Sequence, residues 1–182
     1  HPAQMEALTG HLSRLPRAET LKIWCAGCSR GEEAYSLSYL LHRLGLPHRI
    51  RATDNDEESL AQAALAVYRE EAFRLLPRAY EIEAVGDGRF TVLPEVRRAV
   101  DFEWSDLLKK ASPKSAYHVV VCRNVLIYFD KKTQLKVLDG LVQVAVGRCD
   151  DAHVDLNRPH ATDPIEDSFL EEPKQLGLEI DL

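Results

Sequence analysis

The sequence predicts an α/β fold in which helices cover a parallel β-sheet. Short runs rich in apolar and β-branched residues alternate with longer segments whose apolar residues recur every three or four positions, as strands alternate with helices in such folds. The chain has 182 residues, 45% of them hydrophobic and 29% charged, which suffices for one domain with a buried core. One stretch breaks the alternation and predicts a small antiparallel insertion.

The first strand and helix have the clearest signals. Residues 21–25 form a strand-like run with apolar odd positions, and a turn of small residues, 26–31, follows directly. From Glu32 the apolar residues recur at helical spacing until Gly45 and Pro47 stop the pattern. We expect a strand, a loop and a helix of about three turns.

Two further units continue the alternation. Residues 49–54 predict a second strand that ends in Asp54, and a helix follows from about residue 57 to 67. Residues 118–122 are apolar almost throughout, which is typical of a central strand covered on both faces. A helix is expected from about residue 131 to 146.

Between about residues 77 and 104 the pattern changes. Two β-rich runs, residues 80–85 and 89–93, flank Gly86-Asp87-Gly88 and predict a hairpin. We therefore expect an insertion over residues 77–104 that forms a small β-subdomain.

The two ends of the chain carry weaker signals. Residue 1 is His and not Met, so we expect residues 1–182 to be one domain cut from a longer chain. After residue 147 the periodicity fades. Residues 152–156 predict a strand, and residues 157–172, rich in Pro and acidic side chains, predict a loop.

Composition excludes several functional classes. The net charge is -6, from 23 Lys and Arg against 29 Asp and Glu, so the chain has no general attraction for nucleic acid or anionic membranes. No apolar run approaches the roughly 20 residues of a membrane-spanning helix, and no signal peptide is evident. The four cysteines do not suit a disulfide framework, and the seven histidines show no metal-ligand spacing. We expect a soluble cytoplasmic protein without metal.

The strongest candidate site follows the first strand. A glycine turn there allows close approach of a ligand, and Asp54 at the end of the next strand is placed to accept hydrogen bonds from ribose hydroxyls. This pair of features does not distinguish dinucleotide from S-adenosylmethionine sites. Structural alternatives remain: Ser29-x-x-Glu32 also fits a helix capping box, and Asp54 alone could be a helix N-cap.

A different functional class is suggested by two cysteines. Cys25 and Cys28 have the spacing of a thioredoxin-type redox motif. Such a motif needs its first thiol at a helix N-terminus, whereas Cys25 is expected at the end of a strand. A thiol-disulfide oxidoreductase is therefore the remote alternative.

Two longer stretches carry a family resemblance. Residues 23–36 (IWCAGCSRGEEAYS) and 122–130 (CRNVLIYFD) resemble the two signature stretches of CheR-type chemotaxis receptor methyltransferases. Residues 52–54 and 102–108 fall where that family has its ribose-binding acid and its Asn-Leu motif. The resemblance covers roughly residues 3 to 146.

The resemblance implies a Rossmann-like class I methyltransferase sheet with a small antiparallel β-subdomain. It also implies transfer of a methyl group from S-adenosylmethionine to glutamate side chains of chemoreceptors, with S-adenosylhomocysteine as the product. The partners would be the cytoplasmic domains of chemoreceptors, and a receptor tail could add a strand to the β-subdomain.

The same resemblance implies roles for individual residues. Arg123 and Tyr128 would face the transferred methyl group and the acceptor carboxylate. Asp54 would hold the ribose. The remaining cofactor contacts would come from Ala26, Gly27, Glu32, Asp106, Leu107 and Asn124.

Three departures from the family pattern keep an alternative open. The family's N-terminal helical domain, which ends in a Thr-x-Phe-Phe-Arg segment, is not found in this chain. Asp106 stands where the family has Asn, and the Pro-Gly-Gly turn expected after the last helix is not recognisable. The alternative is a methyltransferase-like binding or regulatory module without catalysis.

Overall fold

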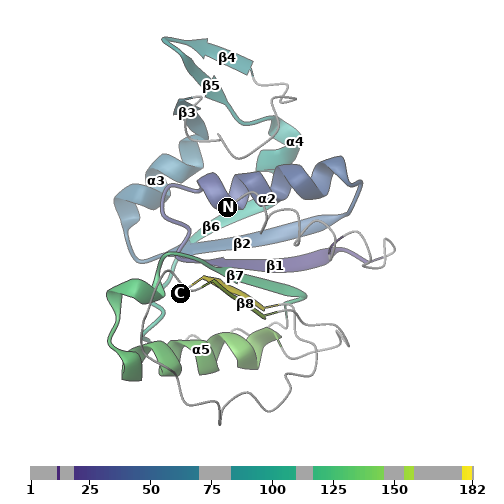
Figure 1. The fold of residues 1–182 in the computed structure, drawn as a ribbon. Coiled ribbons are helices and arrows are strands. Elements are labelled where there is room, and N and C mark those ends of the chain that lie inside the picture. The colour runs from purple at the N-terminus through teal and green to yellow at the C-terminus, as the bar shows by residue number, and fades with distance from the viewer. Residues whose placement is uncertain are drawn as a thin grey trace.

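A computed structural model describes residue 12 and residues 19–69, 83–109, 117–145, 154–157 and 178–181. Six strands form one sheet in the order β6-β2-β1-β7-β9-β8, and every neighbouring pair is parallel. This confirms the predicted parallel α/β architecture (Figure 1). The strands are β1 Leu21–Ala26, β2 His48–Asp54, β6 Val100–Trp104, β7 Val119–Cys122, β8 Val154–Asn157 and β9 Leu178–Asp181.

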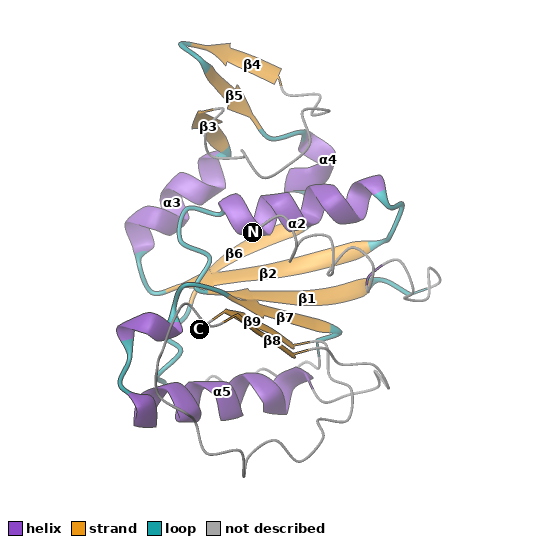
Figure 2. Cartoon of the chain, in the orientation of Figure 1, coloured by secondary structure: helices purple, strands orange, loops and turns teal. Residues whose placement is uncertain are grey.

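Helices cover both faces of this sheet (Figure 2). On one face lie α2, α3 and α4, and on the other lies α5. Their bounds are α2 Glu32–Arg43, α3 Glu57–Leu65, α4 Pro94–Arg97 and α5 Lys131–Ala145, with a short 3-10 helix η2 at Leu126–Tyr128. Among the described residues, no helix is both long and apolar enough to cross a membrane.

The alternation of side chains along the central strands builds two separate cores. In β1, Ile23 and Cys25 belong to the core beneath α2, while Trp24 and Ala26 belong to the core beneath α5. Successive strand residues point to opposite faces, so a strand covered on both sides must be apolar throughout. The four residues of β7 are buried for the same reason, which confirms its predicted central position.

The helix predicted for residues 57–67 ends earlier than expected. α3 stops at Leu65 because Ala66 adopts a left-handed conformation, with φ 56°, and terminates the helix. Val67 instead begins a strand, β3 Val67–Arg69. The prediction that the helix extends to Val67, which was based on helical spacing, is therefore wrong.

A second sheet has three antiparallel strands in the order β3-β5-β4 and projects beyond α3 and α4 (Figure 1). The predicted hairpin is present as β4 Glu83–Gly86 and β5 Arg89–Thr91. The limits of the predicted insertion, residues 77–104, differ from those of this sheet. β3 precedes that range, and β6, within it, pairs with β2 in the main sheet.

The strand predicted for residues 152–156 is present as β8, but the rest of the carboxyl-terminal part differs from the expectation. β8 begins at Val154 and ends at Asn157, where a loop was predicted to start, and residues 158–172 lie outside the described part of the chain. β9, which was not predicted, lies between β7 and β8. The position of a four-residue strand depends on pairing with strands that are distant in sequence, and local periodicity cannot predict that pairing.

Candidate functional site

Because the strands of the main sheet are parallel, the residues that follow β1, β2, β6 and β7 meet at one edge of it. This edge, beyond the carboxyl ends of the strands, is where open α/β sheets bind ligands. It receives the glycine turn after β1, Asp54 from β2, Asp106 after β6 and Arg123 after β7. The candidate site residues therefore come from four separate strand ends.

The turn between β1 and α2 depends on two glycines. Gly27 has φ 76°, and a Cβ atom there would lie 2.2 Å from Cγ2 of Val125. Gly31 has φ 85°, and its Cβ would lie 2.8 Å from the ring of Phe102. The turn is also tied to β2, because the Gly27 N–H donates to the Thr53 carbonyl at 2.8 Å. Backbone conformation and close packing both require glycine here.

Asp54 links this turn to the start of α3. Its Oδ2 accepts a hydrogen bond from Ser29 N at 2.7 Å, and its Oδ1 accepts one from Asp56 N at 3.0 Å. The N-cap of α3 is Asp56, whose side chain accepts from Glu58 N. The N-cap interpretation of Asp54 is therefore wrong. Each carboxylate oxygen keeps a free lone pair that can accept from a ligand.

The capping-box interpretation of Ser29 and Glu32 is wrong as well. The N-cap of α2 is Gly31, and no side chain caps this helix. Ser29 lies two residues before it, with φ 47°, and uses its backbone N–H to reach Asp54. Glu32 lies in the first turn of α2.

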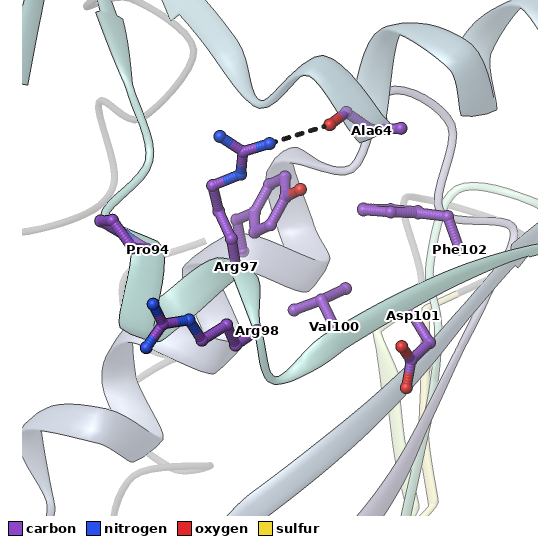
Figure 3. A pocket seen from close by; sticks show the side chains of 8 residues that line it. Ala64, Pro94, Arg97, Arg98, Val100, Asp101 and Phe102 are labelled. Carbon is purple, nitrogen blue, oxygen red and sulfur yellow. Dashed lines mark hydrogen bonds between the residues drawn. The ribbon is translucent and has the colours of Figure 1, made fainter.

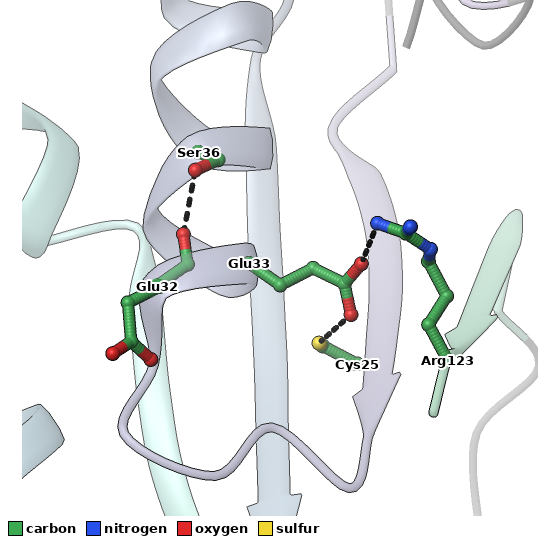
Figure 4. A network of polar contacts seen from close by, with 5 residues as sticks. All are labelled: Cys25, Glu32, Glu33, Ser36 and Arg123. Carbon is green, nitrogen blue, oxygen red and sulfur yellow. Dashed lines mark hydrogen bonds and ion pairs between the residues drawn. The ribbon is translucent and has the colours of Figure 1, made fainter. Parts of the chain in front are cut away.

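Glu33 and Arg123 form an ion pair between α2 and the end of β7. Arg123 Nη1 lies 2.8 Å from Glu33 Oε1, and the two side chains are 17% and 25% exposed. The Cys25 thiol donates to the other oxygen, Oε2, at 3.8 Å (Figure 4). In the same view Glu32 points away from this network. Sequence reasoning missed Glu33, although the adjacent acids Glu32-Glu33 could have pointed to it.

The cysteines near this network have raised pKa values, whereas redox-active thiols have lowered ones. Burial raises the pKa of Cys25 well above its ordinary value, and the nearby Glu33 carboxylate raises it further. Burial, with the charge of Asp54, raises the pKa of Cys28 to about 12. Reactive thiols need a lowered pKa, so the oxidoreductase alternative has no support in this environment. Cys122, also buried, has its pKa raised to about 12.

The residues after β6 are held within their own turn. Asp106 Oδ1 accepts a hydrogen bond from Leu108 N at 2.9 Å, and Lys109 Nζ lies 3.8 Å from Oδ2. Leu107 packs against the core beneath α5. The preceding Trp104 is 45% exposed, and its indole N–H donates to the Asn55 carbonyl at 3.0 Å.

The second signature stretch contributes residues of different exposure. Asn124 is exposed and has φ 55°, which turns the chain after β7. Val125 packs over Gly27 and so joins this loop to the turn after β1. Tyr128 in η2 is 80% exposed, whereas Phe129 packs against the core beneath α5. Phe129 is therefore a core residue, whereas Tyr128 is available at the surface.

The structure thus places some of the predicted residues in contact with the turn after β1 or with α2, and others away from it. Asp54 contacts the glycine turn through Ser29, and Arg123 contacts Glu33 at the start of α2. Ala26 is buried at the end of β1, with its side chain in the core beneath α5. In the part of the chain that the structure describes, no group of three or more His, Cys, Asp or Glu side chains could hold a metal ion.

Several known proteins are similar to this chain in sequence. Chemotaxis protein methyltransferase 2 of Pseudomonas aeruginosa is 35% identical over 140 residues, 71% of this chain and 50% of that protein. The Borreliella burgdorferi chemotaxis protein methyltransferase is 33% identical over 124 residues, 63% and 44% respectively. That of Listeria innocua is 41% identical over 115 residues, 60% and 43% respectively. The chain spans about half the length of the curated relatives it matches.

The solved structure of magnesium protoporphyrin IX methyltransferase from Synechocystis PCC 6803, with bound SAM, covers 80% of this chain and 55% of its own. Its TM-score is 0.49 and its sequence identity 19%. The sequence profile of the family described as CheR methyltransferase, SAM binding domain, matches residues 2–147. Because that match spans well over half of the chain, the chain belongs to the CheR methyltransferase SAM-binding domain family.

Proposed function

We propose that this chain, in the cytoplasm, transfers the methyl group of S-adenosylmethionine to glutamate carboxylates of chemoreceptors. One observation carries the proposal: the hydrogen bond from Ser29 N to Asp54 joins the glycine turn to the acid at the end of β2. This arrangement lies at the edge of the parallel sheet where nucleoside ligands bind. The names of the similar proteins, which are chemotaxis protein methyltransferases, support the reaction class.

The residues at this edge fit an adenosyl ligand. Asp54 is half-buried, and its two oxygens each use one lone pair within the protein. Two neighbouring hydroxyls of a ribose can donate to the remaining lone pairs. Val125 already fills the space beside Gly27, and Ala26 is buried, so the turn offers a ligand its backbone and not these side chains.

When bound, S-adenosylmethionine supplies a methyl group on a sulfonium sulfur, which is the electrophile. The acceptor needs no strong general base, because a glutamate side chain with a reference pKa of about 4.3 is already ionised at neutral pH. The task of the chain is therefore orientation, which can supply about 7–11 kcal/mol of a barrier.

Arg123 is the residue we propose to orient the acceptor carboxylate. Its guanidinium already binds one carboxylate, that of Glu33, through Nη1. A guanidinium has five N–H donors in a planar fork and can bind more than one carboxylate. Glu33 would thus hold Arg123 in place. Tyr128, whose side chain is 80% exposed, would contact the methyl group or the acceptor.

Calorimetry with S-adenosylhomocysteine tests the cofactor site. We expect wild-type chain to bind it and Asp54→Ala to lose most of the affinity, while Asp139→Ala, on the exposed side of α5, binds as wild type does. Absence of binding by the wild-type chain, or unchanged binding by Asp54→Ala, would overturn the assignment.

A transfer assay tests the acceptor side. Chemoreceptor cytoplasmic domains would be incubated with methyl-labelled S-adenosylmethionine, and base-labile methyl esters would be measured as released methanol. Tyr128→Phe and Arg123→Ala should retain S-adenosylhomocysteine binding and lose transfer. Binding without transfer by the wild-type chain would instead identify a non-catalytic module.

We further propose that a receptor tail docks on the small sheet. β5 is its central strand, so β3 and β4 each present an edge to which an extended peptide can add. Crosslinking of a photoreactive tail peptide should label residues of β3 or β4. Labelling confined to the main sheet would contradict this placement.

A further inference from the structure

A pocket lies on the α2 side of the main sheet, against its edge strand β6 (Figure 3). Its volume is about 550 Å³. None of the residues assigned to methyl transfer lines it. The lining residues are Tyr35, Ala64, Pro94, Arg97, Arg98, Val100, Asp101 and Phe102.

Two arginines that have no acidic partner among the described residues, Arg97 and Arg98, line this pocket. Arg97 Nη2 donates to the Ala64 carbonyl at 3.3 Å, and Arg98 is exposed. Arg49, which does not line the pocket, donates from Nη1 to the Arg98 carbonyl at 2.6 Å. Among the described residues, none of these three arginines forms an ion pair. In a chain of net charge -6, this side of the molecule therefore carries a local concentration of positive charge.

One acidic side chain also lines the pocket. Asp101 is exposed and lies in register with Arg51 of β2. Because residues alternate along a strand, its side chain leaves β6 on the face opposite to Val100 and Phe102. The Asp101 carboxylate therefore lies across β6 from Val100 and Phe102 and repels an acidic ligand in the pocket only weakly, from a distance.

The edge of β6 next to the pocket has unused hydrogen-bonding groups. Ala99 O accepts from Ile50 N, and Ser105 N donates to Asp54 O, so every second peptide group of β6 faces β2. The N–H and C=O groups of Val100, Phe102 and Trp104 consequently face away from β2. In the described structure β6 pairs only with β2, which leaves these groups free to pair with an added strand.

We propose that an acidic protein segment in extended conformation docks along the free edge of β6 and places carboxylates beside Arg97 and Arg98. The main-chain groups of β6 would bind the segment backbone, and the arginines would select acidic side chains. This docking site is separate from the methyl-transfer site, which lies at the carboxyl ends of the strands, and does not depend on it.

Fluorescence anisotropy with a labelled peptide of alternating Glu and Val tests the proposal. We expect the wild-type chain to bind it, and the Gln-Val peptide to bind much more weakly. Arg97→Gln combined with Arg98→Gln should weaken binding about tenfold, as expected for two exposed charge pairs. Asp101→Asn should strengthen binding. The matched control is Lys132→Gln with Lys136→Gln, which removes two charges from exposed positions of α5 on the opposite face.

Two further measurements separate the parts of the proposal. Methylation of alternate peptide nitrogens should abolish binding in one register only, because an added strand uses every second N–H. S-adenosylhomocysteine binding should be unchanged in Arg97→Gln with Arg98→Gln, which shows that the variant is folded. The proposal would be overturned if the wild-type chain bound the Glu and Gln peptides equally well. It would also be overturned if the Arg97→Gln, Arg98→Gln variant bound the Glu peptide as well as the α5 control variant does.

Discussion

At the scale of single residues, Gly27 is the position where backbone and packing demands coincide. Its φ of 76° disfavours any side chain, and the atom that a Cβ would meet, Val125 Cγ2, is only 2.2 Å away. Gly45 has a similar φ of 65° but nothing within 4 Å of its Cβ position. Replacing Gly45 by alanine would therefore carry only the cost of the left-handed conformation, whereas replacing Gly27 would add a steric clash.

We predict that Gly27→Ala destabilises the chain by more than about 2 kcal/mol, since the left-handed conformation alone costs roughly 1–2 kcal/mol for a side-chain-bearing residue. Gly45→Ala should show that conformational cost only. Urea unfolding measures both, and Val125→Ala should restore part of the stability lost in Gly27→Ala. Equal losses for the two glycines would show that Val125 yields without cost.

The buried thiols should be chemically inert in the folded chain. Burial raises the pKa of Cys25, Cys28 and Cys122, so little thiolate is present at neutral pH. In a Cys149→Ser background, a disulfide reagent at about pH 7.5 should label the native chain far more slowly than the chain unfolded in guanidinium. Rapid labelling of native Cys28 would revive the redox alternative.

At the scale of elements, a histidine joins α2, β2 and the end of α4. The Ser38 hydroxyl donates to the Val96 carbonyl, and its oxygen lies 2.9 Å from His48 Nε2. His48 Nδ1 lies 2.8 Å from the Leu46 carbonyl. Burial lowers the pKa of His48 below its ordinary value. The folded chain therefore binds this proton less readily than the unfolded chain does.

This difference predicts a pH dependence of stability. Because the unfolded state binds more protons, the contribution of His48 is complete above its unfolded pKa of about 6.5 and is lost as pH falls toward the folded pKa. Urea unfolding at about pH 7 and pH 5 should show a smaller loss for His48→Gln than for the wild-type chain. A loss equal to that of the wild-type chain in His48→Gln would contradict the prediction.

The elements also show why local patterns succeed or fail. α2 lies where its periodic leucines predict a helix, and β1 and β7 lie where their apolar runs predict strands. These predictions succeed because the positions that face a core must be apolar. The end of α3 at Ala66 and the start of β3 at Val67 depend instead on pairing of β3 with β5, more than twenty positions away. Propensity is a weak guide wherever such distant pairing decides.

At the scale of the whole molecule, the two sheets differ in how they are supported. The central strands β1 and β7 have neighbours on both sides and helices over both faces. The small sheet has strands of three or four residues, and Phe90 and Tyr68 connect it to the core beneath α2. Local stability should therefore fall from the main sheet to the small one.

Amide hydrogen exchange measures this difference. We expect the slowest exchange in β1 and β7 and much faster exchange in β4 and β5. Phe90→Ala should speed exchange in β5 and leave β7 unchanged, while Val85→Ala, at an exposed position of β4, should change neither. Uniform exchange across both sheets would show that they unfold as one unit.

The sequence by itself determined the parallel α/β class, the order of the first strands and helices, and the strand ends at which Asp54 and Arg123 lie. These features depend on burial patterns and turn residues that are close together in the sequence. Only the tertiary structure decided the place of β9 between β7 and β8, the ion pair of Glu33 with Arg123, and the arginine-lined pocket beside β6. Each of these depends on residues that are far apart in the chain and meet only when the sheet has formed.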